Sequence, residues 1–226
     1  MSQGKDIILI HNPGGWGQTR LENCQEWEKS LVTGISTTLE EMGYSPILTQ
    51  YFRTYGGWQE QMWDMKNQFR FFASKSTAMA AGIQFLIKHT NTYRIILIGV
   101  SQGAAFTNAV MQKLSGFRQV YSIEVGFFFP YMPWRRVSER TLALDDNGLI
   151  SDPLVHRNLR AAVKAFAVAP FRWCRYYLTG RPKKFSYCIN VSGHDYSWNY
   201  PEVQRQIVDF LESNLAINKG TERGPL

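Results

Sequence analysis

The sequence of 226 residues has few cysteines and no long apolar run, and these absences exclude several classes of protein. Its three cysteines are widely spaced, so they form neither the disulfide framework of a small secreted protein nor a metal-binding pattern. No apolar stretch approaches the ~20 residues that a helix needs to cross a bilayer. The first apolar run, Ile7 to Ile10, is too short for a signal peptide. We therefore expect a cytoplasmic protein, or one released without a signal peptide, for example by lysis.

Acidic residues are scarce in one part of the chain, which makes the distribution of charge uneven. Residues 135–184 contain eleven Lys and Arg and four Asp and Glu, so this segment carries the whole formal net charge of +7. Such a basic face is either simply solvated or attracts an anionic surface, such as a membrane or an acidic cell envelope. No recognition motif accompanies the charge, so nucleic acid is not an expected partner.

The most informative stretch is a strand, a sharp turn and a helix in direct succession. Ile95 to Ile98 is a β-branched and Leu run of the kind found in parallel strands covered on both faces. Gly99-Val100-Ser101-Gln102-Gly103 follows at once, and residues 104–114 are expected to form a helix. This G-x-S-x-G pattern is typical of a nucleophile elbow, whose strained turn exposes the serine hydroxyl. It predicts Ser101 as a nucleophile, against the alternative of a tight turn that happens to contain a serine.

Strands alternate with helices along the chain, which indicates a single α/β domain with a mainly parallel sheet covered on both faces. We expect about six strands, and between the last two a helical insertion at about residues 153–182 that acts as a lid or a linker. The expected strands are residues 6–10, 46–52, 93–98, 120–127, 141–144 and 185–191. The main helices are expected within residues 19–42, 62–89, 104–114, 153–182 and 201–215.

A serine nucleophile needs a base and a carboxylate that orients this base. His194 follows the last expected strand and lies downstream of Ser101, in the chain order serine, acid, histidine, so it is the predicted base. The other three histidines have simpler explanations. His11 ends the first strand, where a structural hydrogen bond is more typical, and His89 ends a helix, where it complements the helix dipole. His156 sits in the first turn of the basic helical segment.

Four carboxylates are candidates for the acid. Asp146 is preferred because it lies in a turn at the C-terminal end of a strand, and Asp145 is its near twin. Asp152 has another explanation, as the N-cap of a helix with Pro153 at its first position. Glu124 on the fourth expected strand is the last candidate, because some lipases carry the acid there.

Backbone N–H groups must stabilise the oxyanion that forms in such a reaction. One of them should come from the glycine-rich loop that follows the first strand. Gly14, Gly15 and Trp16 remain candidates there after a proline that has no N–H to donate, and Gly15 and Trp16 are the predicted donors.

The run Gly99-Val100-Ser101-Gln102-Gly103-Ala104 resembles the motif of cutinases. From the first strand to His194 the layout is similar to that of cutinase-like α/β-hydrolases, including the mycolyl esterases of mycobacteriophages. The resemblance implies an α/β-hydrolase fold, Ser101 as nucleophile, His194 as base and the N–H of Gln102 as an oxyanion donor. Two features depart from the family: the paired cysteines of secreted cutinases are missing, and residues 145–149 do not reproduce its Gly-Asp acid motif.

The sequence therefore predicts a serine esterase that hydrolyses carboxylic esters through Ser101, His194 and Asp146 and an acyl-enzyme, with no cofactor and no metal. The expected substrate is a small-molecule or lipid ester with an apolar acyl part. A thioesterase or an acyltransferase would use the same triad. A non-catalytic binding protein on the hydrolase fold is the alternative from another class. The acyl length, the leaving group and the oligomeric state stay open.

Overall fold

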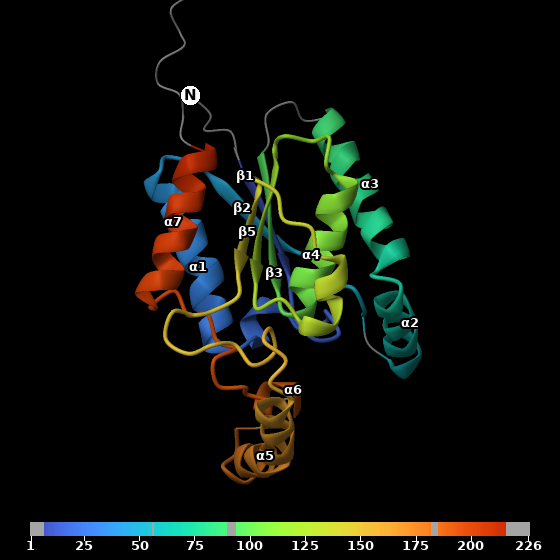
Figure 1. Cartoon of the computed structure of the whole chain (residues 1–226), viewed down its shortest axis with the longest axis vertical. Helices are drawn as coiled ribbons and strands as arrows, with labels where there is room; N and C mark the ends of the chain where they lie inside the picture. Colours follow the sequence, from blue (N-terminus) through green and yellow to red (C-terminus); the bar gives the residue numbers. More distant parts are fainter. Residues whose placement is uncertain (1–6, 56, 90–93, 182–184, 216–226) are drawn as a thin grey trace, which may run out of the picture.

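The computed structural model describes residues 7–55, 57–89, 94–181 and 185–215. The described residues form a five-stranded, all-parallel sheet flanked by helices, with the strand order β2-β1-β3-β4-β5 (Figure 1). The strands are β1 (Ile7–Asn12), β2 (Pro46–Gln50), β3 (Arg94–Val100), β4 (Val120–Val125) and β5 (Thr141–Leu144). The expected α/β architecture with a parallel sheet is thus confirmed.

Helices cover both faces of the sheet because the inner strands are apolar on both sides. Successive side chains of a strand point to opposite faces, so Leu97 of β3 packs toward α3 (Ala73–His89) and α4 (Gln102–Lys113). Its neighbour Ile98 packs toward α1 (Glu26–Glu41) and α7 (Pro201–Leu215). Figure 1 shows these two helix pairs on opposite sides of the sheet, with α2 (Trp58–Phe69) beyond the end of α3.

The strand register brings the carboxyl ends of four strands to one edge of the sheet. Asn12 pairs with Gly99, Val100 with Val125, and Val125 with Leu144. Loops that follow β1, β3, β4 and β5 therefore start side by side. We call this edge the carboxyl edge, and in open parallel sheets it is where ligands usually bind.

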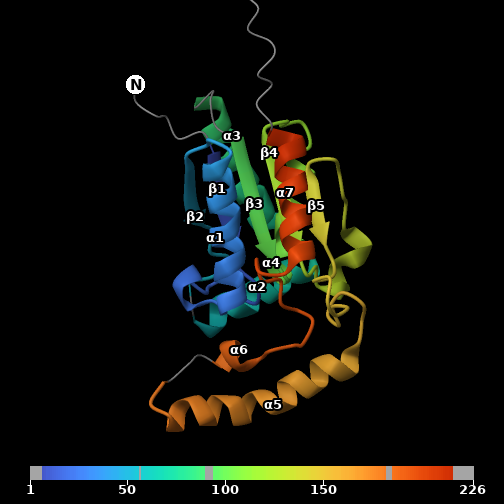
Figure 2. The same ribbon diagram turned by 90° about the vertical axis from the view of Figure 1, so that its left-hand side faces the viewer.

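A separate helical arm, α5 (Leu159–Leu178) with α6 (Phe185–Cys188), lies beyond the carboxyl edge (Figures 1 and 2). Its helix α5 falls within the segment expected as a helical insertion, although helix begins at Leu159 rather than at Pro153. No helix of the described residues is both long enough and apolar enough to cross a membrane.

The prediction of a sixth strand at residues 185–191 is wrong. Its first four described residues form α6, and residues 189–191 are irregular. A strand needs a neighbouring strand for its backbone hydrogen bonds, but this segment lies in the arm. There the guanidinium of Arg172 donates instead to the carbonyls of Cys188 and Asn190, at 3.4 and 3.2 Å.

Two of the expected helices begin or break elsewhere. Within the helix expected at residues 19–42, a 3-10 turn (Leu21–Asn23) comes first, and α1 begins only after Gln25, without a side-chain cap. The helical region 62–89 is divided into α2 and α3, because Phe71 and Phe72 both have positive φ angles, 47° and 55°. A second 3-10 helix, η2 (Phe129–Trp134), connects β4 toward β5.

Candidate active site

Ser101 sits in a strained turn between β3 and α4, as the G-x-S-x-G pattern predicts. Its φ of 56° and ψ of −116° lie outside the regions that L-residues normally adopt. Its N–H donates to the carbonyl of Val125 on the neighbouring strand, at 2.8 Å. A Cβ at Gly103 would lie 2.1 Å from the carbonyl oxygen of Asn12, and one at Gly99 would lie 2.7 Å from the Cα of Ala104. Both glycines are therefore required by close backbone approaches.

His194 lies against the strand next to that of Ser101. Gly126, the residue after β4, has a φ of 60°, and a Cβ there would stand 2.6 Å from Cε1 of His194. Since the N–H of Ser101 binds the carbonyl of Val125, the serine and the histidine occupy adjoining strand ends at the carboxyl edge. Among the described residues, Nε2 of His194 makes no hydrogen bond, and none joins it to the hydroxyl of Ser101.

The carboxylate that meets His194 is Asp152. Its Oδ2 lies 2.6 Å from Nδ1 of the histidine, and the side chain of Asp152 is completely buried. The hydroxyl of Tyr196 donates to the same oxygen, also at 2.6 Å. Burial, followed by the charge of Asp152, raises the pKa of this tyrosine, which keeps its hydroxyl a donor. The other oxygen, Oδ1, accepts the backbone N–H of Leu154 at 2.8 Å.

The preference for Asp146 as the partner of His194 is wrong. The side chain of Asp146 is half exposed, and its Oδ1 accepts the backbone N–H of Asp152 at 3.1 Å and lies 3.3 Å from Nε2 of His156. A bridge between Asp146 and Ser151 folds the chain back on itself. Asp146 thus supports the turn from which Asp152 reaches the histidine.

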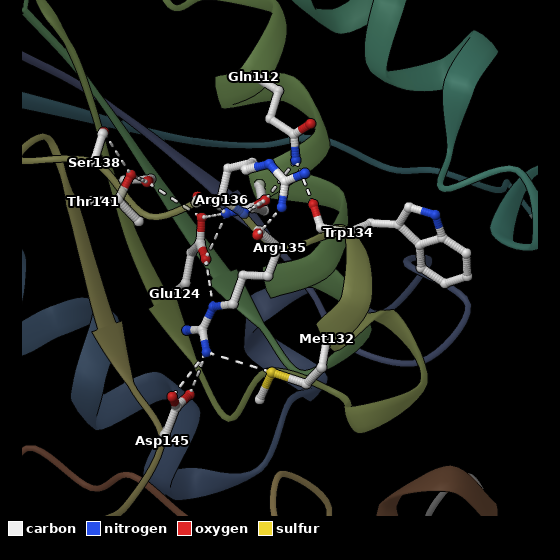
Figure 3. A network of polar contacts seen from close by, with 11 residues as sticks. Gln112, Glu124, Met132, Trp134, Arg135, Arg136, Ser138, Thr141 and Asp145 are labelled. Atoms are coloured by element: carbon white, nitrogen blue, oxygen red, sulfur yellow. Dashed lines mark hydrogen bonds and ion pairs between the residues drawn. The ribbon is translucent and has the colours of Figure 1, made fainter.

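The other two candidate acids belong to a separate polar network around Arg135 (Figure 3). Asp145 accepts from the guanidinium of Arg135 at 2.8 and 2.9 Å. Glu124 is completely buried, accepts from the Asn108 amide at 2.8 and 3.1 Å, and lies 3.6 Å from Nε of Arg135. Burial outweighs these favourable contacts and raises the pKa of Glu124 to about 8. None of the hydrogen bonds and ion pairs between described residues joins this network directly to His194.

The loop after β1 packs against the candidate nucleophile. A Cβ at Gly14 would lie 3.4 Å from the Cβ of Ser101 and 3.2 Å from the carbonyl oxygen of Val100. None of the hydrogen bonds between described residues uses the N–H of Gly14, Gly15 or Trp16. The N–H of Gln102, in the first turn of α4, has no acceptor within its helix either. Within the described part of the chain, the predicted oxyanion donors therefore have no hydrogen-bond acceptor.

Arg53, which the sequence analysis did not single out, holds this loop in place. The buried guanidinium of Arg53 donates to the carbonyl of Pro13 at 3.0 Å and to that of Gly15. The backbone N–H of Arg53 donates to the carbonyl of Gly17 at 2.9 Å. Burial lowers the pKa of Arg53 to about 10, which still leaves it charged at neutral pH. Asp64 balances part of this charge, with Oδ2 at 3.9 Å from Nε. The carbonyls of Pro13 and Gly15 are thus occupied, whereas no hydrogen bond between described residues uses the N–H groups of residues 14–16.

A cleft of about 800 Å³ opens between the body and the arm. On the body side it is lined by Trp27, whose ring meets that of His194 edge-on with centroids 6.5 Å apart. On the arm side Arg172, Arg175, Tyr176 and Tyr187 contribute to its wall. Trp27 is the link between this cleft and His194, and the lining of the cleft includes neither His194 nor Ser101.

The remaining candidate residues have structural roles. His11 is buried between Glu28, at 2.9 Å from Nε2, and Gln50, at 3.0 Å from Nδ1, as expected for a structural histidine. Within the described ranges, no three His, Cys, Asp or Glu side chains gather into a group that could hold a metal ion.

Comparison with known proteins adds no relative. No protein-family model matches this sequence, and no curated protein is similar enough to be counted as related. The functional interpretation therefore rests on the geometry of the site.

Proposed function

We propose that the protein is a serine hydrolase that cleaves carboxylic esters, with Ser101, His194 and Asp152 as its catalytic triad. The observation that carries the proposal is the 2.6 Å contact between the buried Asp152 carboxylate and Nδ1 of His194, beside a serine held at a φ of 56°. A carboxylate in this position selects the tautomer whose Nε2 can take a proton. As part of the proposal we assign the parallel sheet and its helices to the α/β-hydrolase fold and to the cutinase-like type.

In the proposed reaction the Oγ of Ser101 attacks the ester carbonyl carbon, and its proton passes to Nε2 of His194. The negative charge moves to the carbonyl oxygen, where the N–H of Gln102 and those of the loop at residues 14–16 donate to it. Collapse of the tetrahedral intermediate breaks the bond to the alcohol, which takes the proton from His194. Water then attacks the acyl-enzyme by the same route and releases the acid and the free serine.

Two further features support this assignment. Asp152 is excluded from water and has a second donor in Tyr196, so its carboxylate is fixed in place before any substrate binds. The Arg53 network holds the oxyanion loop in the same way, because it ties down the carbonyls of Pro13 and Gly15. Fixed donors and acceptors of this kind contribute to rate because they need no rearrangement when charge develops.

The test is labelling with a fluorophosphonate probe together with hydrolysis of a soluble p-nitrophenyl ester. We expect the probe to modify Ser101, and Ser101→Ala to lose both labelling and turnover, with a decrease on the order of 10⁶ in rate. Ser115→Ala, which changes an exposed serine after α4, should behave like the wild type. A wild-type protein that neither reacts with the probe nor hydrolyses any ester or thioester would reject the proposal in favour of a non-catalytic role.

A further inference from the structure

The helix α5 exposes one face to solvent along its whole length, and this face carries large apolar side chains. Phe171 and Leu178 are 76% and 84% exposed, and Val163 is 66% exposed. Ala165 and Ala169, on the opposite side of the helix, are buried. Positions three or four apart share a face of a helix, so the exposed side chains form one stripe. We call it the outer face of α5, and it consists of Arg160, Val163, Lys164, Ala167, Pro170, Phe171, Cys174, Arg175, Tyr177 and Leu178; Arg175 stands at its margin and also lines the cleft toward the body.

The charge of this part of the chain has one sign. Residues 153–194 contain eight Lys and Arg and no Asp or Glu. The three cations of the outer face, Arg160, Lys164 and Arg175, are exposed and form no salt bridge with any described residue. These cations alternate along the helix with exposed aromatic and aliphatic side chains. Such a face is complementary to a surface with negatively charged groups at its boundary with water and an apolar layer beneath them. An anionic lipid interface has this chemistry.

The position of the outer face in the fold also favours a lipid interface. The arm lies beyond the carboxyl edge of the sheet, the edge at which Ser101 and His194 stand (Figures 1 and 2). Leu149 and Ile150, 65% and 55% exposed, follow β5 at this edge, and Trp16, 39% exposed, follows β1. Exposed apolar side chains thus lie at the carboxyl edge as well as on the arm.

We infer that the outer face of α5 binds an anionic lipid surface and thereby places the candidate site on the interface that holds its ester substrate. The helix lies in the headgroup layer, with Phe171 and Leu178 in contact with acyl chains and Arg160, Lys164 and Arg175 near phosphate groups. The substrate part of this inference rests on the proposed function, whereas the binding part does not.

Vesicle binding is measured with the full chain carrying Ser101→Ala, so that no lipid is hydrolysed. Sedimentation compares vesicles of phosphatidylcholine with vesicles that also contain phosphatidylglycerol. We expect strong partition onto the anionic vesicles only, weakened by salt. Arg160→Gln and Lys164→Gln should each reduce partition about fivefold, and Phe171→Ser with Leu178→Ser should reduce it at least roughly tenfold.

Matched control variants lie on α3, away from the arm. Phe85 is 60% exposed and Lys88 is exposed near the end of α3 that precedes β3, so Phe85→Ser and Lys88→Gln remove the same kinds of side chain. They should leave partition unchanged. Equal losses in the α3 and α5 variants, or equal binding to both kinds of vesicle, would overturn the inference.

Cys174 gives an independent readout of the contact. It is exposed on the outer face, while Cys24 and Cys188 are buried, so an environment-sensitive fluorophore can be attached to it selectively. Its emission should shift to the blue on anionic vesicles. Self-association that depends on Phe171 and Leu178, without vesicle binding, would instead identify a second copy of the chain as the occupant and reject the lipid surface. Vesicle binding without any esterase activity would reject the proposed function and leave the docking inference standing.

Discussion

Asp152 and Glu124 are both completely buried carboxylates near the carboxyl edge, yet their surroundings differ in kind. Asp152 receives hydrogen bonds from Tyr196 and from a backbone N–H, and it faces a histidine whose side chain is 12% exposed. Glu124 is surrounded by the amide of Asn108 and the guanidinium of Arg135. Burial alone thus does not identify a catalytic acid. The residue that the carboxylate contacts distinguishes the two, because a carboxylate can influence a reaction at the surface of the protein only if it faces an accessible base.

The largest effect in this comparison should come from Asp152→Asn. The amide keeps an oxygen for the N–H of Leu154 but no longer stabilises the tautomer of His194 that catalysis needs. We expect turnover of a soluble ester to fall roughly 10⁴-fold, while circular dichroism shows a retained fold. Asp146→Asn is the matched control and should stay close to wild type. The reverse pattern, with loss only in Asp146→Asn, would show that the resting contact of His194 is not the productive one.

A smaller loss of turnover should follow from Gly126→Ala, because the added methyl group would collide with the ring of His194. The new Cβ would stand 2.6 Å from Cε1 and 2.9 Å from Nδ1 of His194, so the ring must move. A displacement of this size is expected to cost roughly 10² in turnover. Gly43→Ala is the control that introduces backbone strain without a collision. Gly43 has a φ of 90°, but no atom lies within 4 Å of an added Cβ. This variant should lower the melting temperature without affecting turnover; equal kinetic losses in both variants would contradict the steric explanation.

Glu124→Gln should have the smallest effect on catalysis and act on stability instead. The folded protein holds the Glu124 proton up to about pH 8, whereas an unfolded chain releases it near the ordinary pKa of 4.5. The contribution of this group to the unfolding free energy is therefore full below about pH 4.5 and is lost as the pH rises toward about 8. Urea unfolding across this window should show a steeper loss for wild type than for the variant. If the unfolding free energies of wild type and variant changed in parallel with pH, or if the variant lost most of its turnover, Glu124 would not differ from Asp152 in the way described.

The sheet and the serine turn could be predicted because their local requirements are strong. The apolar run Ile95 to Ile98 needs cover on both faces, and Gly99 and Gly103 stand where any Cβ would collide with backbone. His194 was singled out by chain order and by its place after a strand that the structure lacks, and it lies at the strand end next to that of Ser101. No sequence signal indicates Arg53, because its function depends on carbonyl groups of a loop that lies about 40 residues earlier, as the separation of Arg53 and Pro13 shows.

The carboxylate that contacts His194 was not predicted, because in the sequence a helix cap and a triad acid are competing explanations for Asp152. In the structure one carboxylate does both: Oδ1 caps the turn at Leu154, and Oδ2 holds His194. The strand expected at residues 185–191 was wrong for a related reason. Its apolar pattern is compatible with a strand, but strand formation depends on a neighbour, and that neighbour is a property of the fold rather than of the segment.

The contact between Asp152 and His194 also determines how the arm is attached. These residues are 42 positions apart in the chain but only 2.6 Å apart in space, so the intervening segment leaves and rejoins the body at a single point. A segment held in this way can change in length at little entropic cost, about 0.6 kcal/mol for each doubling of a flexible loop. We therefore expect the arm to be exchangeable: a different helix grafted between the same two residues should leave the contact between Asp152 and His194 in place.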